Sequence, residues 1–363
     1  MIQNFRRVFL TGLLLILGVQ LAIAAEGPGN DSNQIDIQGK LRNEYFLDFS
    51  PVFGKIQLPR IIYDNNGLHF FSSTTAAINS NSGLTDEYYE EGHSKIIKNG
   101  VIQPVTYELV KDDGGHIIAD FSLSVAIVYF MLSGFLVLLV FIYLNKKYSE
   151  GVGRETEPKG VLQNMFETIV IFVRDEIALI NIGPEKYLKF TPYLLSAFFM
   201  ILFMNLFELI PWGESPTANL TVTAALATVT FLVTQFNGSK DHWKEVFWFP
   251  GVPVFVKPIM AVVEFLGLFT KPFALCIRLF ANMASGKVLI LSMIGLIFVF
   301  ANKFGAGMAY GTSPIWIVMT LFIYMIKLLV AFIQAYIFTI LSALFIGLAT
   351  AEHEHHDAEP AHQ

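Results

Sequence analysis

The sequence has 363 residues, of which 54% are hydrophobic and only 15% are charged, whereas about a quarter of a soluble domain is charged. Its formal net charge of −6 and the lack of a basic stripe exclude a nucleic-acid-binding surface. We therefore expect a chain that lies mostly in lipid. Its single cysteine, Cys276, excludes an internal disulfide and is expected to be a small packing residue.

The first 25 residues have the pattern of a secretory signal peptide. Arg6 and Arg7 precede an apolar run over residues 8–21, and residues 22–24 (Ala-Ile-Ala) fit a cleavage site. An uncleaved first membrane span is the alternative. If the segment is cleaved, the mature N-terminus lies outside the cytoplasm.

Residues 26–120 are polar and rich in Asn, Gly and Ser, without a long apolar run. Asn66-Gly67 separates residues 61–63 from 68–71, and Asn99-Gly100 separates residues 95–98 from 101–103. Each Asn-Gly pair suits a two-residue hairpin turn, because both central residues of a type I′ turn need positive φ. We predict a small β-rich extracytoplasmic domain here.

The apolar segments expected to cross the membrane lie within residues 121–350. Residues 122–144 contain no charge and are long enough for a hydrocarbon core of about 30 Å. Lys146 and Lys147 follow, which indicates that this end is cytoplasmic. Residues 161–180 mix charged and apolar side chains, as is typical of an amphipathic helix at the interface; a helix in a soluble loop is the alternative.

Two further spans are predicted at residues 190–210 and 219–236, and a very long apolar segment covers residues 258–300. At about 1.5 Å per residue this last segment would extend about 64 Å, so we expect it to be tilted or to lie partly along the interface. A glycine-rich turn at 302–313, a last helix from Pro314 to about Ala349, and a cytoplasmic tail at 351–363 are expected to follow. The predicted fold class is an all-α polytopic membrane protein with about five transmembrane helices, including a long tilted helical hairpin, plus the small β-rich domain.

Arg278 is the most informative residue, because apolar residues flank it on both sides and no acidic residue is adjacent. An arginine at membrane depth costs roughly 3 kcal/mol on insertion scales, and its pKa above about 12 prevents it from losing its charge. Buried charges in membrane proteins mark ion pathways or paired carboxylates. We therefore expect Arg278 to face a partner that needs its charge.

Other polar residues fall on the same helix at helical spacing. Glu264, Lys271 and Arg278 follow one another at intervals of seven residues, so they lie near one stripe, and Asn282 shares the face of Arg278. Lys287 lies about half a rotation away from that stripe. Snorkelling at an interface is an alternative explanation for Glu264 and Lys271.

Lys327 and Gln334 are also seven residues apart, on the last helix, and Glu208 ends the second span. As alternatives to a place in a polar path, Gln334 could hydrogen-bond between helices, and Glu208 could cap its helix. Taken together, ionisable groups at several depths indicate a staged polar path.

These residues belong to a set of motifs that resembles subunit a of the F-type ATP synthases over roughly residues 120–353. The motifs are RLFANM (278–283) with Glu264 fourteen residues before it, LLVAFIQAYIF (328–338), NLFELIP (205–211) and PTANLTVT (216–223).

The resemblance implies a membrane stator subunit beside a rotating ring of c subunits, with two offset half-channels for protons. By this resemblance, Arg278 is the positive charge of the stator that faces the ring, and Gln334 is its neighbour on the last helix. Asn282 and Glu208 would line the extracytoplasmic half-channel, and Glu264 would belong to the cytoplasmic half-channel. It further implies a b-subunit peripheral stalk, indirect contact with a soluble ATPase head, membrane lipids as partners, and a bacterial inner-membrane location. No cofactor, metal or nucleotide site is expected; residues 285–287 lack the remaining residues of a phosphate loop.

Two positions depart from the family pattern, since Lys287 and Lys327 stand where Glu or His is usual. Either protons reach the ring mainly through Glu208, Asn282 and water, or a desolvated lysine relays them. Our hypothesis favours the first, because two protonated lysines would repel cations from the channel.

An ion-coupled secondary transporter is the main rival function, because it too would bury ionisable residues on broken helices. It predicts internal repeats in the two halves of the chain, which the sequence lacks. A receptor-type anchor would need a cytoplasmic signalling module, and an intramembrane enzyme would need a nucleophile pair or metal cluster; neither is visible.

Overall fold

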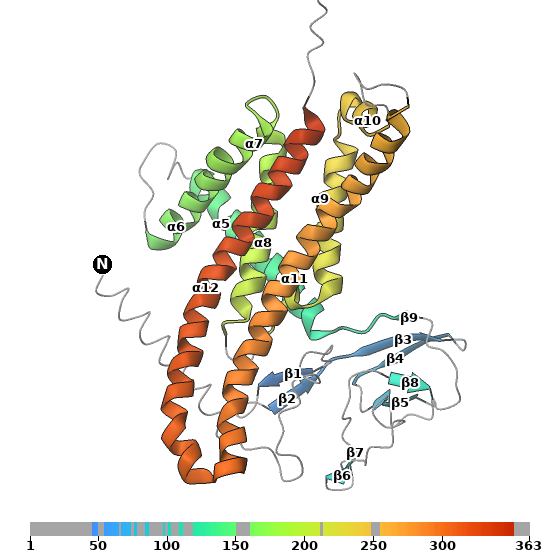
Figure 1. Ribbon diagram of the computed structural model, residues 1–363. Coiled ribbons are helices and arrows are strands. Elements are labelled where there is room, and N and C mark those ends of the chain that lie inside the picture. The colour runs from blue at the N-terminus through green and yellow to red at the C-terminus, as the bar shows by residue number, and fades with distance from the viewer. Residues whose placement is uncertain are drawn as a thin grey trace, which may run out of the picture. The chain divides into compact units, whose positions relative to one another are not determined.

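The computed structural model describes residues 46–49, 54–64, 67–73, 76–77, 84–86, 97–98, 101–102, 109–111, 119–149, 160–210, 213–247 and 255–351 (Figure 1). The predicted signal peptide and residues 352–363 of the predicted tail lie outside these ranges. The chain divides into two compact units. The first comprises Met1–Ser133, Met204–Asn219 and Ala281–Ala331, and the second Gly134–Phe203, Leu220–Phe280 and Phe332–Gln363.

Short antiparallel strands make up the N-terminal part of the first unit. A three-stranded sheet has the order β4-β3-β9, with β3 at Arg60–Asp64, β4 at Gly67–Phe71 and β9 at Ala119–Asp120. The remaining described strands form pairs: β1 (Phe46–Phe49) with β2 (Gly54–Gln57), β5 (Leu84–Asp86) with β8 (Leu109–Lys111), and β6 (Ile97–Lys98) with β7 (Val101–Ile102).

Both predicted hairpins have paired strands. β6 and β7 pair Lys98 with Val101, so two residues connect them, as predicted. β3 and β4 pair Asp64 with Gly67, so Gly67, at φ 120°, already belongs to the ladder rather than to the turn. Asn66, Asn99 and Gly100 themselves lie outside the described residues.

The first unit also contains the start of α5 (Val125–Ser149), the end of α8 (Tyr187–Phe207), the short 3₁₀ helix η2 (Pro216–Ala218), and the joined halves of α11 (Lys257–Phe304) and α12 (Ala306–Thr350). Gly305, at φ 85°, is the whole connection between α11 and α12. Phe300 packs against Trp316 across this hairpin in a tilted arrangement, with ring centroids 5.8 Å apart.

The predicted glycine-rich turn at residues 302–313 is therefore wrong, because almost all of it is helical. The hydroxyl groups of Thr312 and Ser313 donate hydrogen bonds to the backbone carbonyl groups of Met308 and Tyr310, at 2.9 and 3.0 Å. These bonds satisfy the polar side chains within the helix, and glycine is more frequent in transmembrane helices than in soluble ones. The last helix consequently begins eight residues before Pro314, at Ala306.

The regular elements described in the second unit are all helices. It contains α6 (Val161–Ile171), the π-helical η1 (Phe172–Leu179), α7 (Ile180–Ile182), most of α8, α9 (Leu220–Phe236) and α10 (Lys240–Phe247), together with the other parts of α5, α11 and α12. The predicted amphipathic helix at 161–180 is confirmed as a helix, and its π-helical segment was not foreseen. Phe199 of α8 is fully buried and packs against Phe141 and Phe166.

Four helices of the described chain are long and apolar enough to cross a membrane, namely α5, α8, α11 and α12 from Gly307, and α9 is a shorter apolar helix. The prediction of a mostly helical, multi-pass membrane protein is confirmed. α11 has 48 residues, which at about 1.5 Å each extend about 72 Å. A helix of this length exceeds the thickness of a bilayer.

Candidate functional site

Arg278 lies near the middle of α11, and its side chain is exposed on the surface of this chain. It forms no hydrogen bond or ion pair with any residue that the structure describes. Its neighbours Leu275 and Leu279, by contrast, are buried. The helix therefore presents a permanent cation outward from an apolar span.

Small side chains surround Arg278 on the exposed face of α11. Ala274, Ala281 and Ser285 are all exposed and lie four residues before, three after and seven after Arg278, respectively. In membrane helices, small residues allow a neighbouring helix to approach closely. Helical spacing predicted Arg278 and Asn282 on this face, but the small residues near them were not predicted.

The other residues predicted to accompany Arg278 in the second unit differ in exposure. Gln334 on α12 is buried at 2% exposure, whereas Glu264 and Lys271 on α11 are half-buried. Arg278 forms no hydrogen bond or ion pair with Gln334 or Glu264, so such bonds do not join these three predicted residues into one cluster.

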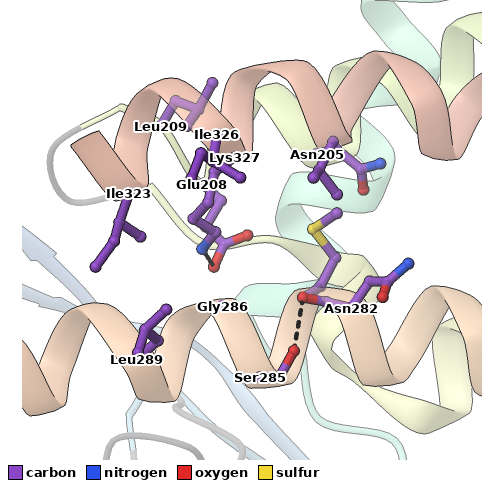
Figure 2. Close-up of a pocket in the computed structure, with 12 residues that line it drawn as sticks. Asn205, Glu208, Leu209, Asn282, Ser285, Gly286, Leu289, Ile323, Ile326 and Lys327 are labelled. Atoms are coloured by element: carbon purple, nitrogen blue, oxygen red, sulfur yellow. Dashed lines mark hydrogen bonds and ion pairs between the residues drawn. The ribbon is translucent and has the colours of Figure 1, made fainter. Parts of the chain in front are cut away.

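A cavity of about 210 Å³ lies within the first unit, between the end of α8, the second half of α11 and the first half of α12 (Figure 2). Its polar lining comes from three elements: Asn205 and Glu208, Asn282 and Ser285, and Lys327. The structure thus brings together three residues predicted from sequence, namely Glu208, Asn282 and Lys327.

Lys327 donates a hydrogen bond to Glu208, and the two form a buried ion pair in this cavity (Figure 2). Their side chains are only 10% and 8% exposed, so each charge depends on the other for compensation. Gly286 makes room for the lysine, because a Cβ atom at this position would lie 2.7 Å from Lys327 Cε. A larger residue at this position would therefore have to displace the end of the Lys327 side chain.

A second ion pair lies in the same unit, between Lys287 and Glu214. Lys287 Nζ is 2.8 Å from Glu214 Oε1 and 2.7 Å from Oε2, and the side chains are 19% and 25% exposed. Glu214 was missed by the sequence analysis. The available signal was a lone acidic residue in a short loop between two apolar spans.

The two lysines were treated from sequence as uncompensated cations that would repel protons. That premise is wrong, because each lysine has a carboxylate partner. Repulsion by the lysines is therefore no longer an argument about the proton path.

Two buried polar atoms at the cavity have no hydrogen-bond partner among the described residues, namely Asn205 Nδ2 and Glu208 Oε2. The oxygen of the Asn205 amide is occupied, since it accepts a 2.7 Å hydrogen bond from Thr217, which in turn bonds Ser215. Buried water molecules are typically held by polar groups that have no other hydrogen-bond partner. The free donor and acceptor at this cavity are groups of that kind. Asn205 was noted from sequence only as part of a motif.

No group of three or more His, Cys, Asp or Glu side chains that could hold a metal ion occurs within the described ranges. Cys276 is buried, and its Sγ atom lies 3.5 Å from the Thr223 hydroxyl oxygen.

Comparison with known proteins gives a consistent result. Residues 127–347 match the family described as ATP synthase A chain. A protein named ATP synthase subunit a from Chloroherpeton thalassium is 43% identical over 246 residues, which cover 67% of this chain and 71% of the relative. Proteins of the same name are 42% identical over 248 residues in Chlorobium phaeobacteroides (67% of this chain, 70% of the relative) and 47% identical over 233 residues in an Anaeromyxobacter species (62% and 53%).

The matched region contains Arg278, the cavity and both ion pairs. Of the described helices long enough to cross a membrane, it includes α8 and α11 in full and all but the first two residues of α5 and the last three of α12. The secondary-transporter alternative is not favoured by any of these relatives. The chain therefore belongs to the ATP synthase subunit a family, the membrane stator subunits of the F-type ATP synthases through which protons are translocated.

Proposed function

We propose that this chain translocates protons as the stator subunit of an ATP synthase and that Arg278 is the charge facing a rotating ring of c subunits. The observation that carries the proposal is the outward-facing guanidinium on an apolar helix, without an acidic partner among the described residues. A cation at this depth is costly and needs a carboxylate from outside the chain. The small residues Ala274, Ala281 and Ser285 would let a ring helix come close enough to supply it.

The electrostatics of such a contact give direction to proton transfer. A ring carboxylate can face lipid only in its protonated form, because burying its charge is expensive. Beside Arg278 the charged form is stabilised, so the proton leaves on one side of the arginine and is regained on the other. Each charge that falls through 100 mV supplies about 2.3 kcal/mol. Arginine suits this role better than lysine, because it cannot lose its proton and pass it across.

We assign the cavity lined by Asn205, Glu208 and Asn282 to the extracytoplasmic half-channel. Its volume of about 210 Å³ is enough for several water molecules. The unpaired Asn205 Nδ2 and Glu208 Oε2 offer a donor and an acceptor to such a chain of water. Glu264, half-buried nearer the start of α11, would serve the cytoplasmic half-channel, and Gln334 would support Arg278 from α12.

In this scheme the lysines are counterions rather than carriers. Lys327 compensates Glu208 and Lys287 compensates Glu214, so the path is close to neutral. A neutral path lined by water admits a proton without the repulsion that unpaired lysines would exert. Glu214 is the additional residue that we place beside this path.

The orientation that we propose rests on where the basic residues gather. Lys146 and Lys147 lie in the last turn of α5. At the start of α8, Lys186 donates a hydrogen bond to the Thr350 carbonyl at the end of α12, and Lys189 donates one to Asn237 after α9. By the positive-inside rule, this end and the C-terminus are cytoplasmic, and the start of α5 is extracytoplasmic.

The remaining assignments follow from this orientation. Residues 1–25 would be a signal peptide, 26–120 an extracytoplasmic β-rich domain, 121–350 the subunit a core and 351–363 a cytoplasmic tail. The partners would be the c ring, a b-subunit peripheral stalk and, indirectly, the ATPase head, in a bacterial inner membrane.

Replacing Arg278 with alanine in the assembled complex tests the central role. ATP-driven proton pumping into inverted vesicles should stop, while ATP hydrolysis by the detached head continues. Copurification of the variant with the ring and the head is the control for assembly. Coupled pumping retained by Arg278→Ala would overturn the proposal.

A further inference from the structure

The β4-β3-β9 sheet has one face made of apolar side chains that are exposed. Leu68 and Phe70 on β4 are 66% and 69% exposed, and Tyr63 on β3 is 43% exposed. A sheet with one face in water normally alternates apolar residues inward with polar residues outward. Here the outward positions are apolar, which is unusual for a surface in contact with water.

The strand register shows that these residues form one continuous patch. Tyr63 is paired with Leu68 and Ile61 with Phe70, so all four side chains share a face. Phe121, which is 65% exposed, extends the patch on the other side of β3, because its N–H donates a 2.8 Å hydrogen bond to the Ile61 carbonyl. We call Ile61, Tyr63, Leu68, Phe70 and Phe121 the apolar sheet face.

The opposite face of the same strands is the buried one. Arg60 and Ile62, which alternate with Ile61 and Tyr63 along β3, are both fully buried. His69 lies on that side of β4 and stacks on Phe71, with ring centroids 6.2 Å apart. The exposure of the apolar sheet face is therefore not a consequence of an inverted or unpacked sheet.

The sheet is attached directly to α5, the first of the described helices that is long and apolar enough to cross a membrane. Ser122 Oγ accepts a 3.0 Å hydrogen bond from Ile61 N–H, and Leu123 N–H bonds the Pro59 carbonyl at 3.4 Å. α5 begins two residues later, at Val125. Figure 1 shows β9 beside β3 and β4, with the chain running from β9 into the start of α5. Because the sheet is hydrogen-bonded to the residues just before α5, it lies within a few residues of the bilayer surface.

We propose that the apolar sheet face rests in the lipid headgroup region, on the side of the membrane where α5 begins. The face carries three aromatic rings and no charged side chain, which is the composition of surfaces that bind at the level of the headgroups. Its continuity with α5, whose Met131 and Phe135 are exposed for contact with acyl chains, favours lipid over a protein as its occupant. The role of Arg278 is independent of this proposal.

Spin labels at single cysteines provide the test, in the assembled complex reconstituted into lipid nanodiscs. The background is Cys276→Ala, and the labelled positions are Leu68→Cys and Phe70→Cys, with His69→Cys on the opposite face of the same strand as the matched control. Collision rates are measured with dissolved oxygen, which concentrates in lipid, and with a water-soluble nickel chelate. We expect the oxygen-to-nickel ratio to be severalfold higher at 68 and 70 than at 69.

Two results would overturn the proposal. Nickel collisions at 68 and 70 as frequent as those of a water-exposed label would show that the face is in solvent, and exclusion of both reagents would show that a protein covers it. A lipid-soluble carbene label applied to the unsubstituted complex avoids any folding defect of the variants. It should modify peptides that contain residues 61–70 and 121, and their absence from the labelled set would equally refute lipid contact.

Discussion

Lys327 offers the sharpest perturbation, because its ion pair with Glu208 is almost fully buried. Lys327→Met removes the ammonium group but keeps much of the side-chain volume. Removing one partner of a buried ion pair typically costs about 3–5 kcal/mol, because the other charge is left uncompensated. Lys287, the other cation that acts electrostatically on Glu208, is already paired with Glu214.

The cost should be largely reversed by removing the second charge. We expect the double variant Glu208→Gln/Lys327→Met to be more stable than Lys327→Met alone, because neither side chain is then charged. The measurement is the thermal midpoint at which the subunit is lost from the purified complex, for both single variants and the double variant. Strictly additive effects would show that the pair is not coupled.

Lys327→Arg separates a counterion from a proton carrier. Arginine keeps the positive charge, but its pKa above about 12 prevents it from releasing a proton. If Lys327 only compensates Glu208, ATP-driven pumping by Lys327→Arg should stay within a few-fold of the parent, as it should for Lys303→Arg, an exposed control near the hairpin end. Replacement by alanine is less informative, because it removes the carrier and the counterion together.

A stable Lys327→Arg complex that cannot pump protons would refute the water path. It would instead show that the lysine itself must deprotonate. Stability and assembly therefore have to be measured on the same preparation as pumping.

Three further substitutions have definite expected outcomes. Arg278→Lys should abolish coupled pumping and raise the passive proton conductance of vesicles, because lysine can deprotonate; an unchanged conductance would contradict this. Gly286→Ala should displace Lys327 and destabilise the complex by about 1–3 kcal/mol, measured as a lower thermal midpoint. Gly267→Ala is the control: nothing lies within 4 Å of its Cβ, so this substitution should be neutral or stabilising. Gly347→Ala should weaken the packing of α12 on α7 by at least about 1–3 kcal/mol, since its Cβ would lie 2.0 Å from a backbone carbonyl oxygen; assembly at wild-type levels would contradict that clash.

The long helices could be predicted from sequence because their signal is local. A run of apolar residues longer than a bilayer is visible without any knowledge of tertiary structure, and α5, α8, α9 and α11 begin within about three residues of the positions expected. The error at 302–313 has the same origin. Glycine, serine and threonine indicate a turn in water, but in a lipid-spanning hairpin the hydroxyl groups bond to their own helix and the glycines are tolerated.

The contacts of the candidate site could be predicted only in part. Motif resemblance identified Glu208, Asn282 and Lys327, and the structure brings all three to one cavity. Glu214 could not be assigned, because its partner Lys287 is 73 residues away in the sequence and only tertiary packing brings the two together. Helical spacing predicts that Lys287 points away from the stripe of Arg278; in the structure Lys287 is half-buried in its ion pair, whereas Arg278 is exposed.

The two kinds of membrane cation in this chain differ in where their charge is compensated, and this difference separates structural from functional roles. Lys327 and Lys287 each have a carboxylate within the same unit, so their charges are satisfied when the subunit folds. Arg278 has none among the described residues, and it points outward between small side chains. A permanent charge that folding leaves uncompensated in an apolar span is stable only when a second molecule supplies an anion. In the proposed function, Arg278 is therefore the residue whose charge is compensated by assembly with a partner rather than by the fold of this chain.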